Sequence, residues 1–386
     1  MGDLAPIAGF DTFLDQEYRH FAFIPKPLPN NVELAARTVK IIAEAERSLG
    51  RLDAATGRLP NPDLLVRPSL YREAVSTSAL EGTYAPLDSV MKAEYVEEKD
   101  RTEEEREILN FVKAAQRGLE LLDTKPICLT LIAELQAILV QGTRGDSNDA
   151  GRLRERQVYI GEKRLGIEES RFVPPPPGDL LRAGMSEWEK WLNLDPSTDD
   201  TPLIAKAAIG HYQFETLHPF SDGNGRLGRL IVVLQLVAAG ALTHPVLNLS
   251  PWLEPRKDLY KDLLLSTTRS GAFDPWVQFF AEAVKDQAED SLRRIDTLID
   301  IRDSMLDALH AKRAKGVILQ IARDLIGYPV ISPSQAASRH GVTYPPANAA
   351  LRRLQELGYV QEITGRNYGR LYACSAVLRV LRSGVE

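Results

Sequence analysis

Apolar residues recur at helical spacing along most of the chain, in segments that glycine, proline or polar runs separate. This spacing predicts amphipathic helices that each press one face against a shared core. The predicted segments are 31–49, 69–80, 107–122, 129–140, 180–192, 202–217, 230–239, 248–266 and 273–309. Residues 1–30 have no helical period, and we expect them to lie over the surface. The fold class is therefore mainly α, a helical bundle.

The helical pattern breaks between residues 151 and 177. Residues 157–160 and 171–173 predict two short strands around a charged turn that contains glycine, which is typical of a β-hairpin. Pro174 to Pro177 then impose an extended segment, because proline fixes φ and cannot donate a hydrogen bond. A small hairpin therefore interrupts the predicted bundle.

Residues 310–386 predict a separate unit of three helices followed by a hairpin, which resembles a winged helix-turn-helix. The first helix is predicted over 312–325, a short second helix is capped by Ser332, and a third runs from Tyr344 to its end at Gly358. Apolar and polar residues then alternate over 359–374 around a turn at 364–367, which predicts the hairpin. We therefore expect a winged helix domain after the bundle.

Two patterns are assigned no role in ligand binding. The charged run at 94–107 predicts a solvated loop or helix start. Met185, Trp188 and Trp191 recur at helical spacing, and we expect them in the core rather than stacked on a base.

The composition is that of an ordinary globular protein large enough for two or three domains. The chain has 386 residues, 44% of them hydrophobic, and a mean hydropathy of -0.21. No apolar run approaches the length of a membrane span, and the N-terminus lacks the pattern of a signal peptide. Cys128 and Cys374 are far apart in sequence, which suits a reducing compartment. We expect a cytoplasmic location without membrane contact.

Charge is distributed unevenly along the chain. The whole sequence has a net charge of -6, but residues 310–386 contain 11 Lys and Arg against 4 Asp and Glu. The rest contains 36 against 49. A basic C-terminal unit on an acidic body suggests that the two parts meet different partners.

Residues 218–229 concentrate ionisable side chains and glycine: His-Pro-Phe-Ser-Asp-Gly-Asn-Gly-Arg-Leu-Gly-Arg. The apolar run that follows predicts that this segment leads into the N-terminus of a buried helix, where unpaired N–H groups attract anions. Gly223 and Gly225 permit a nest of N–H groups around a phosphate. Arg226 and Arg229 lie three residues apart, hence on one helix face, and can bind further phosphate oxygens.

Two further side chains of this segment indicate chemistry at the phosphate. Asp222 offers a carboxylate oxygen of the kind that holds Mg²⁺ against phosphates. His218 has a pKa suited to accepting a proton at neutral pH. Each feature by itself is usually structural, as a turn, a core residue or a solvated helix face. Together they predict a phosphoanhydride bound at a helix start, beside a metal ion and a general base.

The pattern His-Pro-Phe-x-Asp-Gly-Asn-Gly-Arg-x-x-Arg resembles the signature of the Fic family, whose members mostly transfer AMP from ATP to protein hydroxyl groups. The resemblance implies a Fic-type helical bundle in which His218 is the base and Asp222 the Mg²⁺ ligand. It also implies that Asn224 and the neighbouring backbone amides hold the α-phosphate, while Arg226 and Arg229 hold the β- and γ-phosphates. The related Doc branch, which phosphorylates its target, departs from the Gly-Asn-Gly-Arg core that this sequence keeps.

The segment Thr77-Ser-Ala-Leu-Glu81-Gly82 is similar to the inhibitory motif of the same family, Ser/Thr-x-x-x-Glu-Gly/Asn. A glutamate near a helix end is ordinarily a solvated side chain. The resemblance implies instead that Glu81 pairs with Arg229 and competes with the γ-phosphate for the same guanidinium group. We therefore expect an autoinhibited enzyme.

The predicted hairpin occupies the place where Fic proteins carry a flap that docks the target. The resemblance implies that Val158, Tyr159 and Ile160 bind target backbone by strand addition, since main-chain hydrogen bonds are independent of sequence. An ordinary surface hairpin is the alternative. Residues lining the adenine pocket are expected within 248–260 by the same resemblance.

The predicted organisation has three parts. Residues 1–115 form an N-terminal helical region with the inhibitory motif, 116–309 the Fic catalytic core, and 310–386 the winged helix domain. The function implied is that of a protein adenylyltransferase, a nucleotidyltransferase that moves AMP from ATP to a Ser, Thr or Tyr hydroxyl of a target and of itself.

Other functions fit the same motifs. One alternative is a transcriptional regulator whose C-terminal unit binds an operator while the bundle senses nucleotide. Alternatively, the enzyme moves phosphate, UMP or phosphocholine, as some family members do, or removes AMP.

The basic C-terminal unit has several candidate partners. For DNA, the groove-facing residues would be Asn348, Arg352 and Arg353, with Arg366 and Arg370 on phosphates. Winged helices also serve as protein–protein and dimer modules, so a partner protein and a second copy of the chain are the alternatives.

Overall fold

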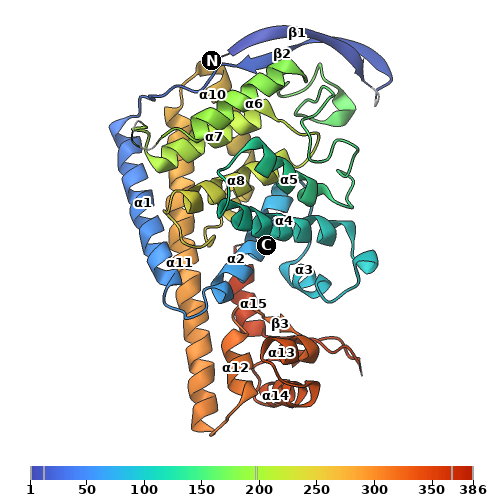
Figure 1. Cartoon of the computed structure of the whole chain (residues 1–386), viewed down its shortest axis with the longest axis vertical. Helices are drawn as coiled ribbons and strands as arrows, with labels where there is room; N and C mark the ends of the chain where they lie inside the picture. The colour runs from blue at the N-terminus through green and yellow to red at the C-terminus, as the bar shows by residue number, and fades with distance from the viewer. Residues whose placement is uncertain (1, 12–13, 196, 198, 367, 385–386) are drawn as a thin grey trace.

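Long helices dominate the computed structural model, which describes residues 2–11, 14–195, 197, 199–366 and 368–384 (Figure 1). The helices of the bundle are α1 (Ala36–Thr56), α2 (Asp63–Leu80), α3 (Leu87–Ala93), α4 (Glu103–Leu122), α5 (Leu129–Val140), α6 (Asp179–Leu192), α7 (Leu203–Leu217), α8 (Asn224–Ala238), α9 (Ser250–Leu253), α10 (Lys257–Ser270) and α11 (Asp274–Ala311). Three-residue 3₁₀ turns lie at Glu98–Asp100, Lys163–Leu165 and Glu254–Arg256. The mainly α prediction is confirmed.

Helix α8 is the central element of the bundle. It packs against α2, α4, α5 and α7, while α1 lies beside the N-terminal part of the much longer α11 (Figure 1). The core around α7 is rich in aromatic side chains whose polar atoms are satisfied: Trp188 donates to Gly210 O at 2.9 Å and Trp276 to Ala208 O at 2.7 Å. Met185, Trp188 and Trp191 are buried, which confirms their assignment to the core.

Helix boundaries depart from the prediction where tertiary contacts outweigh local preference. Helix α1 does not end at Gly50 but continues to Thr56, because Leu49 and Leu52 are buried in the core on either side of the glycine. Glycine inside a helix costs only about 0.5–1 kcal/mol, which such burial offsets. Helix α2 likewise begins six residues earlier than expected, at Asp63, and contains Pro68.

The N-terminal residues form an antiparallel hairpin that the prediction did not include. Strands β1 (Gly2–Asp11) and β2 (Gln16–Pro25) pair from Gly2 opposite Pro25 to Asp11 opposite Gln16. The ribbon extends from the end of the bundle near α6 (Figure 1). Its contact with the bundle includes Ala22, which is buried, and the N–H of Phe23, which donates to Val173 O at 2.9 Å.

The predicted hairpin at 151–177 is present only in part. Ile160 and Phe172 form a single antiparallel bridge, and no regular strand forms over 157–160 or 171–173. The extent predicted for both strands is therefore wrong. The reason is that residue 173 pairs with strand β2 instead of with residues 157–160. Val173 O accepts its hydrogen bond from Phe23 N of β2.

The C-terminal unit contains the predicted helices, as α12 (Val317–Asp324), α13 (Pro333–Arg339) and α14 (Tyr344–Glu356), and a three-stranded sheet of order β3-β5-β4. The strands β3 (Val330–Ile331), β4 (Gln361–Glu362) and β5 (Tyr372–Ala373) have two residues each. Ser332 accepts from Gln335 N at 3.0 Å, as a helix cap should. Asn367, part of the predicted turn, lies outside the described residues. The winged helix interpretation stays a prediction.

This unit is less separate than its composition suggests. An additional helix, α15 (Ser375–Arg382), packs against α11 and α2, and Tyr95 donates to Val330 O at 2.7 Å. One cluster of buried apolar side chains runs from the bundle into the unit. None of the described helices combines the length and the apolar composition that crossing a bilayer requires.

Candidate active site

The segment 218–229 forms a tight turn between α7 and α8. His218 ends α7 in the left-handed conformation, with φ of 47°, and Gly223 precedes α8 with φ of 82°. Asn224 closes the turn, because its side chain accepts from Phe220 N at 2.9 Å and donates to Phe220 O at 2.7 Å. Helix α8 therefore begins directly at the turn, as the sequence predicted.

Asn224 is buried, and in this structure its side chain holds the turn. Its predicted contact with an α-phosphate stays a prediction. The neighbouring Gly225 has a clear steric reason to be glycine, since a Cβ there would collide with the carboxylate of Glu81.

His218 is held as a neutral imidazole. Its carbonyl oxygen accepts from Arg154 Nε at 2.8 Å, and its ring Nδ1 is buried without a hydrogen-bond partner in the described part of the chain. Burial and the positive charge of Arg154 lower the pKa of His218 to about 4. The ring is therefore unprotonated near neutral pH, but it is a weaker base than the imidazole with a near-neutral pKa that the sequence led us to expect.

Arg229 is engaged by the end of α2. Its Nε donates to Thr77 Oγ1 at 2.7 Å, and its Nη2 donates to Thr77 O at 3.1 Å and to Glu81 Oε1 at 2.7 Å. Burial disfavours the charge on Glu81, but Arg229 outweighs this effect and holds the pKa of Glu81 below its usual value. The pairing of Glu81 with Arg229 is confirmed, and Gly82 follows it with φ of 89°.

Asp222 projects beside the start of α8 with 42% of its side chain exposed. Its Oδ1 accepts from Gly223 N at 2.6 Å and lies 3.7 Å from Arg226 Nη2. No group of three or more His, Cys, Asp or Glu that could hold a metal occurs among the described residues.

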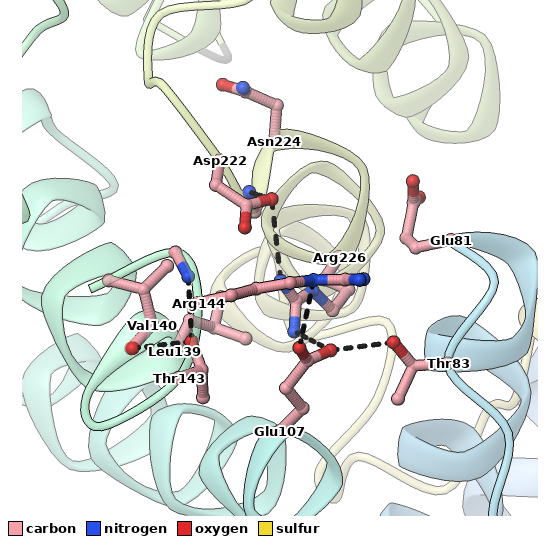
Figure 2. Close-up of polar contacts among 12 residues, drawn as sticks. Glu81, Thr83, Glu107, Leu139, Val140, Thr143, Arg144, Asp222, Asn224 and Arg226 are labelled. Carbon is pink, nitrogen blue, oxygen red and sulfur yellow. Dashed lines mark hydrogen bonds and ion pairs between the residues drawn. The ribbon is translucent and has the colours of Figure 1, made fainter. Parts of the chain in front are cut away.

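Arg226 meets a carboxylate that the sequence did not single out. Its Nη1 lies 3.4 Å from Glu107 Oε2, and the same oxygen accepts from Thr83 Oγ1 at 2.7 Å (Figure 2). Glu107 belongs to the charged run for which we expected no function, and that expectation of a solvated segment is wrong at this position. A usable signal existed: Glu107, Phe111 and Ala114 share one helix face, and the other two are apolar.

A cavity of about 160 Å³ opens beside the turn. Its apolar wall consists of Ile160, Phe172, Tyr260, Leu264 and Leu265, and its polar part includes Glu81, Glu215, His218 and Arg229. Of the residues 248–260 in which we expected an adenine pocket, Tyr260 lines this cavity, whereas the rest of its apolar wall comes from the segment 151–177 and from later turns of α10. The binding of adenine there stays a prediction. An apolar wall next to convergent polar groups suits a flat heterocycle.

Two groups with strongly shifted pKa values belong to this region: Glu215 lines the cavity, and His211 contacts Tyr260, which also lines it. His211 Nε2 lies 2.8 Å from the hydroxyl of Tyr260, and burial, followed by the charge of Arg229, lowers the pKa of His211 to about 3. Burial raises the pKa of Glu215 to about 7. Such shifts gather at functional sites more often than elsewhere.

The three flap residues are not equivalent in the structure. Ile160 lines the cavity, whereas Tyr159 packs against the cluster of Ala22, Ile167 and Val173 beneath the N-terminal hairpin. Val158 is part of neither group. The predicted role of the flap in docking a target stays a prediction.

Comparisons with known proteins agree with this geometry. The family model described as Fic/DOC family N-terminal matches residues 39–120, and that described as Fic/DOC family matches 126–236. The chain is similar to the protein adenylyltransferase Fic of Drosophila ananassae, with 28% identity over 273 residues, which cover 67% of this chain and 51% of that protein. It is also similar to the protein adenylyltransferase Fic of Drosophila virilis, with 31% identity over 224 residues, which cover 57% of this chain and 42% of that protein. The chain spans about half the length of these relatives.

Solved structures with the same fold include a Fic family protein from Desulfovibrio desulfuricans G20, with a TM-score of 0.58 and 19% identity over 91% of this chain and 98% of that one. The Fic-1 structure from C. elegans has a TM-score of 0.50 and 22% identity, and the match covers 68% of this chain and 74% of that one. Both likenesses concern the fold.

Proposed function

The chain belongs to the Fic/DOC family, and from this premise we propose that it is a protein adenylyltransferase that moves AMP from ATP to a hydroxyl side chain. The observation that carries the proposal is the turn itself. It brings the neutral His218 and the carboxylate of Asp222 to the N-terminus of α8, with the buried guanidinium groups of Arg226 and Arg229 beside them.

The residues of the turn divide the chemistry between them. His218 accepts the proton of the incoming Ser, Thr or Tyr hydroxyl, whose oxygen forms a bond to the α-phosphorus of ATP. The bond from that phosphorus to the bridging oxygen breaks, and pyrophosphate leaves with the electron pair. The N–H groups of α8 and the two arginines stabilise the negative charge on the departing phosphates.

Asp222 is the residue that would hold a magnesium ion at this place. The ion, when bound, would neutralise phosphate charge and polarise the phosphoanhydride. The exposure of the Asp222 carboxylate next to the first N–H groups of α8 supports this assignment.

We also propose that Glu81 inhibits the enzyme. Its carboxylate accepts from Nη2 of Arg229, the guanidinium group that a γ-phosphate would need, and Thr77 accepts from Nε and Nη2. A nucleotide that cannot engage Arg229 is not aligned for in-line attack. Displacement of the end of α2 would release Arg229.

The flap is proposed to place the target. Ile160 borders the cavity near His218, so a target segment that pairs with residues 158–160 would bring its hydroxyl toward the imidazole. The bridge to Phe172 supports an extended backbone at Ile160.

Labelled ATP tests the reaction type. The chain should label protein from ATP with radioactive α-phosphate and not from ATP with radioactive γ-phosphate. Label from the γ position would indicate phosphoryl transfer, label from UTP would indicate UMP transfer, and loss of AMP from a labelled target would indicate the reverse hydrolytic activity. Each of these outcomes would replace adenylyl transfer as the assigned reaction.

A second candidate function, nucleic-acid binding by residues 310–386, has one supporting observation. Arg352 and Arg366 are exposed in a unit with an excess of basic residues. Footprinting with the full chain and an Arg352→Ala/Arg353→Ala variant tests it, and DNA protection that does not depend on these arginines or on salt would contradict it.

A further inference from the structure

An arginine from outside the signature segment reaches the same site. Arg144 lies on the loop that follows α5, and its Nε is 3.5 Å from Glu107 Oε1. Figure 2 shows its side chain extending toward the pair of Glu107 and Arg226, with Asp222 nearby. The side chain is 67% exposed, although the carboxylate that it faces is buried.

The backbone of this loop is held against the turn. A Cβ at Gly145 would collide with the carboxylate of Asp222, so glycine permits the close approach. Arg144 N donates to Glu103 Oε1 at 3.1 Å, Gly142 N donates to Asp146 Oδ2 at 2.7 Å, and Asp149 accepts from Ser221. The fold therefore places the backbone that carries Arg144 against the turn beside Asp222.

Glu107 connects the two arginines through different oxygens. Its Oε1 faces Arg144, and its Oε2 faces Arg226 and accepts from Thr83. A buried carboxylate is costly unless charged partners surround it, and one carboxylate does not saturate two guanidinium groups. Glu107 therefore positions the two guanidinium groups next to each other.

The arginines themselves are poorly satisfied. The contacts of Arg226 with Glu107 and Asp222 are 3.4 and 3.7 Å long, beyond the range of good hydrogen bonds. Arg226 Nε is buried and has no acceptor in the described part of the chain. Buried donors without partners are rare, and beside an open anion site they indicate a ligand that supplies the acceptors.

We propose that Arg144 is a third phosphate-binding arginine, which together with Arg226 contacts the terminal phosphates of ATP, and that Glu107 is the positioning residue for both. This inference rests on the proposed function, because the anion is taken to be the triphosphate. Phosphates are favoured over target peptide because Arg226 and the loop that carries Arg144 lie against Asp222, the carboxylate assigned to the magnesium ion.

The test is the affinity of the full chain for two nucleotides, measured by calorimetry with Mg²⁺ in a Glu81→Gly background. The probes are AMP and the ATP analogue with a methylene bridge between the α- and β-phosphates, which cannot transfer AMP. Arg144→Ala should weaken the analogue about tenfold or more and leave AMP unchanged, since a charged hydrogen bond is lost only with the longer ligand. Arg144→Lys should show a smaller loss.

Two controls make the result specific. Arg182→Ala removes a comparably exposed arginine on α6 and should change neither affinity. Glu107→Gln keeps the shape of the side chain but removes its charge. It should lower the ratio of analogue affinity to AMP affinity, and a purely structural role of Glu107 would leave that ratio unchanged.

The outcomes separate the two proposals. If the Glu81→Gly chain binds AMP but gains no affinity from the additional phosphates, the proposed function fails and this inference with it. If the chain prefers the analogue and Arg144→Ala keeps that preference intact, Arg144 is not a phosphate ligand, while the adenylyl transfer proposal stands.

Discussion

The carboxylate of Glu81 and the guanidinium of Arg229, 148 residues apart in sequence, lie 2.7 Å from each other where the end of α2 meets the first turns of α8. Arg229 is almost fully buried, whereas 42% of the Glu81 side chain is exposed. A competing ligand in the solvent can therefore reach this ion pair only from the side of Glu81. The proposed inhibition would end if the anion of a ligand replaced Glu81 at Arg229.

Replacing Glu81 with glycine should raise self-labelling from α-labelled ATP by about tenfold or more. The reason is that a charge-assisted hydrogen bond worth about 1.5–3 kcal/mol no longer competes with the phosphate for Arg229. Glu97→Gly, at an exposed position away from the site, is the matched control. Labelling by Glu81→Gly equal to or below that of the unchanged chain would contradict the inhibitory role.

Replacing His218 with alanine should lower the rate of AMP transfer by about 10²–10⁴-fold, the usual contribution of a general base. Nucleotide affinity should change little, because the ring is assigned to the incoming hydroxyl and not to the phosphates. Single-turnover labelling in the Glu81→Gly background measures the first quantity, and calorimetry the second. A rate that survives the substitution would remove His218 from the mechanism.

The pH dependence of transfer should show no loss from His218 between pH 5 and 8. A histidine with a pKa near 6.5 is almost entirely protonated at pH 5, whereas His218, with a pKa of about 4, stays mostly neutral. The measurement is the rate constant of labelling against pH. A decline with an apparent pKa near 6.5 would show that the imidazole is not held neutral.

The same shift affects folding, so circular dichroism must accompany the pH profile. Because the pKa of His218 is lower in the folded chain than in the unfolded one, the unfolded chain binds more protons below pH 6.5. The corresponding stability is fully present above pH 6.5 and is lost as the pH falls toward 4. A rate decline that parallels loss of helical signal would report unfolding rather than catalysis.

Removal of Mg²⁺ with a chelator should abolish labelling, and Asp222→Asn should weaken it strongly. A neutral amide is a poorer ligand for a hard divalent cation than a carboxylate. Excess Mg²⁺ should fully restore labelling by the unchanged chain, but it should only partly restore labelling by Asp222→Asn. Transfer that persists in the chelator would exclude Asp222 as the magnesium ligand.

Glu107→Ala should lower the free energy of unfolding by about 3 kcal/mol, because it leaves the buried Arg226 with only its longer contact to Asp222. Glu104→Ala, an exposed position on the same helix, should change it by about 0.5 kcal/mol or less. Guanidinium denaturation followed by circular dichroism compares the two. Equal midpoints would mean that Glu107 does not stabilise this part of the fold.

Patterns confined to neighbouring residues allowed a close prediction of much of the structure. The helix at 129–140 has the predicted bounds, and the turn from His218 to Gly223 leads into the N-terminus of α8 as expected. These features depend on spacing, capping and glycine conformation within one short segment. The resemblance carried by the twelve-residue signature and by Thr77-x-x-x-Glu81 then led to the pairing of Glu81 with Arg229.

Features that depend on distant segments were not predictable in the same way. The N-terminal hairpin replaced an expected surface segment, and its second strand took the hydrogen bond at Val173 that the predicted flap strand would have used. Glu107 was grouped with solvated charges. The side chain is buried because Thr83, Arg144 and Arg226 converge on it from three other parts of the chain.

The residue types of 218–229 are enough to predict an anion site, since amides, guanidinium groups, a carboxylate and an imidazole have the same chemistry wherever they occur. Packing of α2, α4 and the loop after α5 around α8 decided which of these groups are engaged and by what. Burial is a property of the surroundings and not of the residue. The ionisation of His218, the occupation of Arg229 and the position of Arg144 therefore follow only from the folded chain.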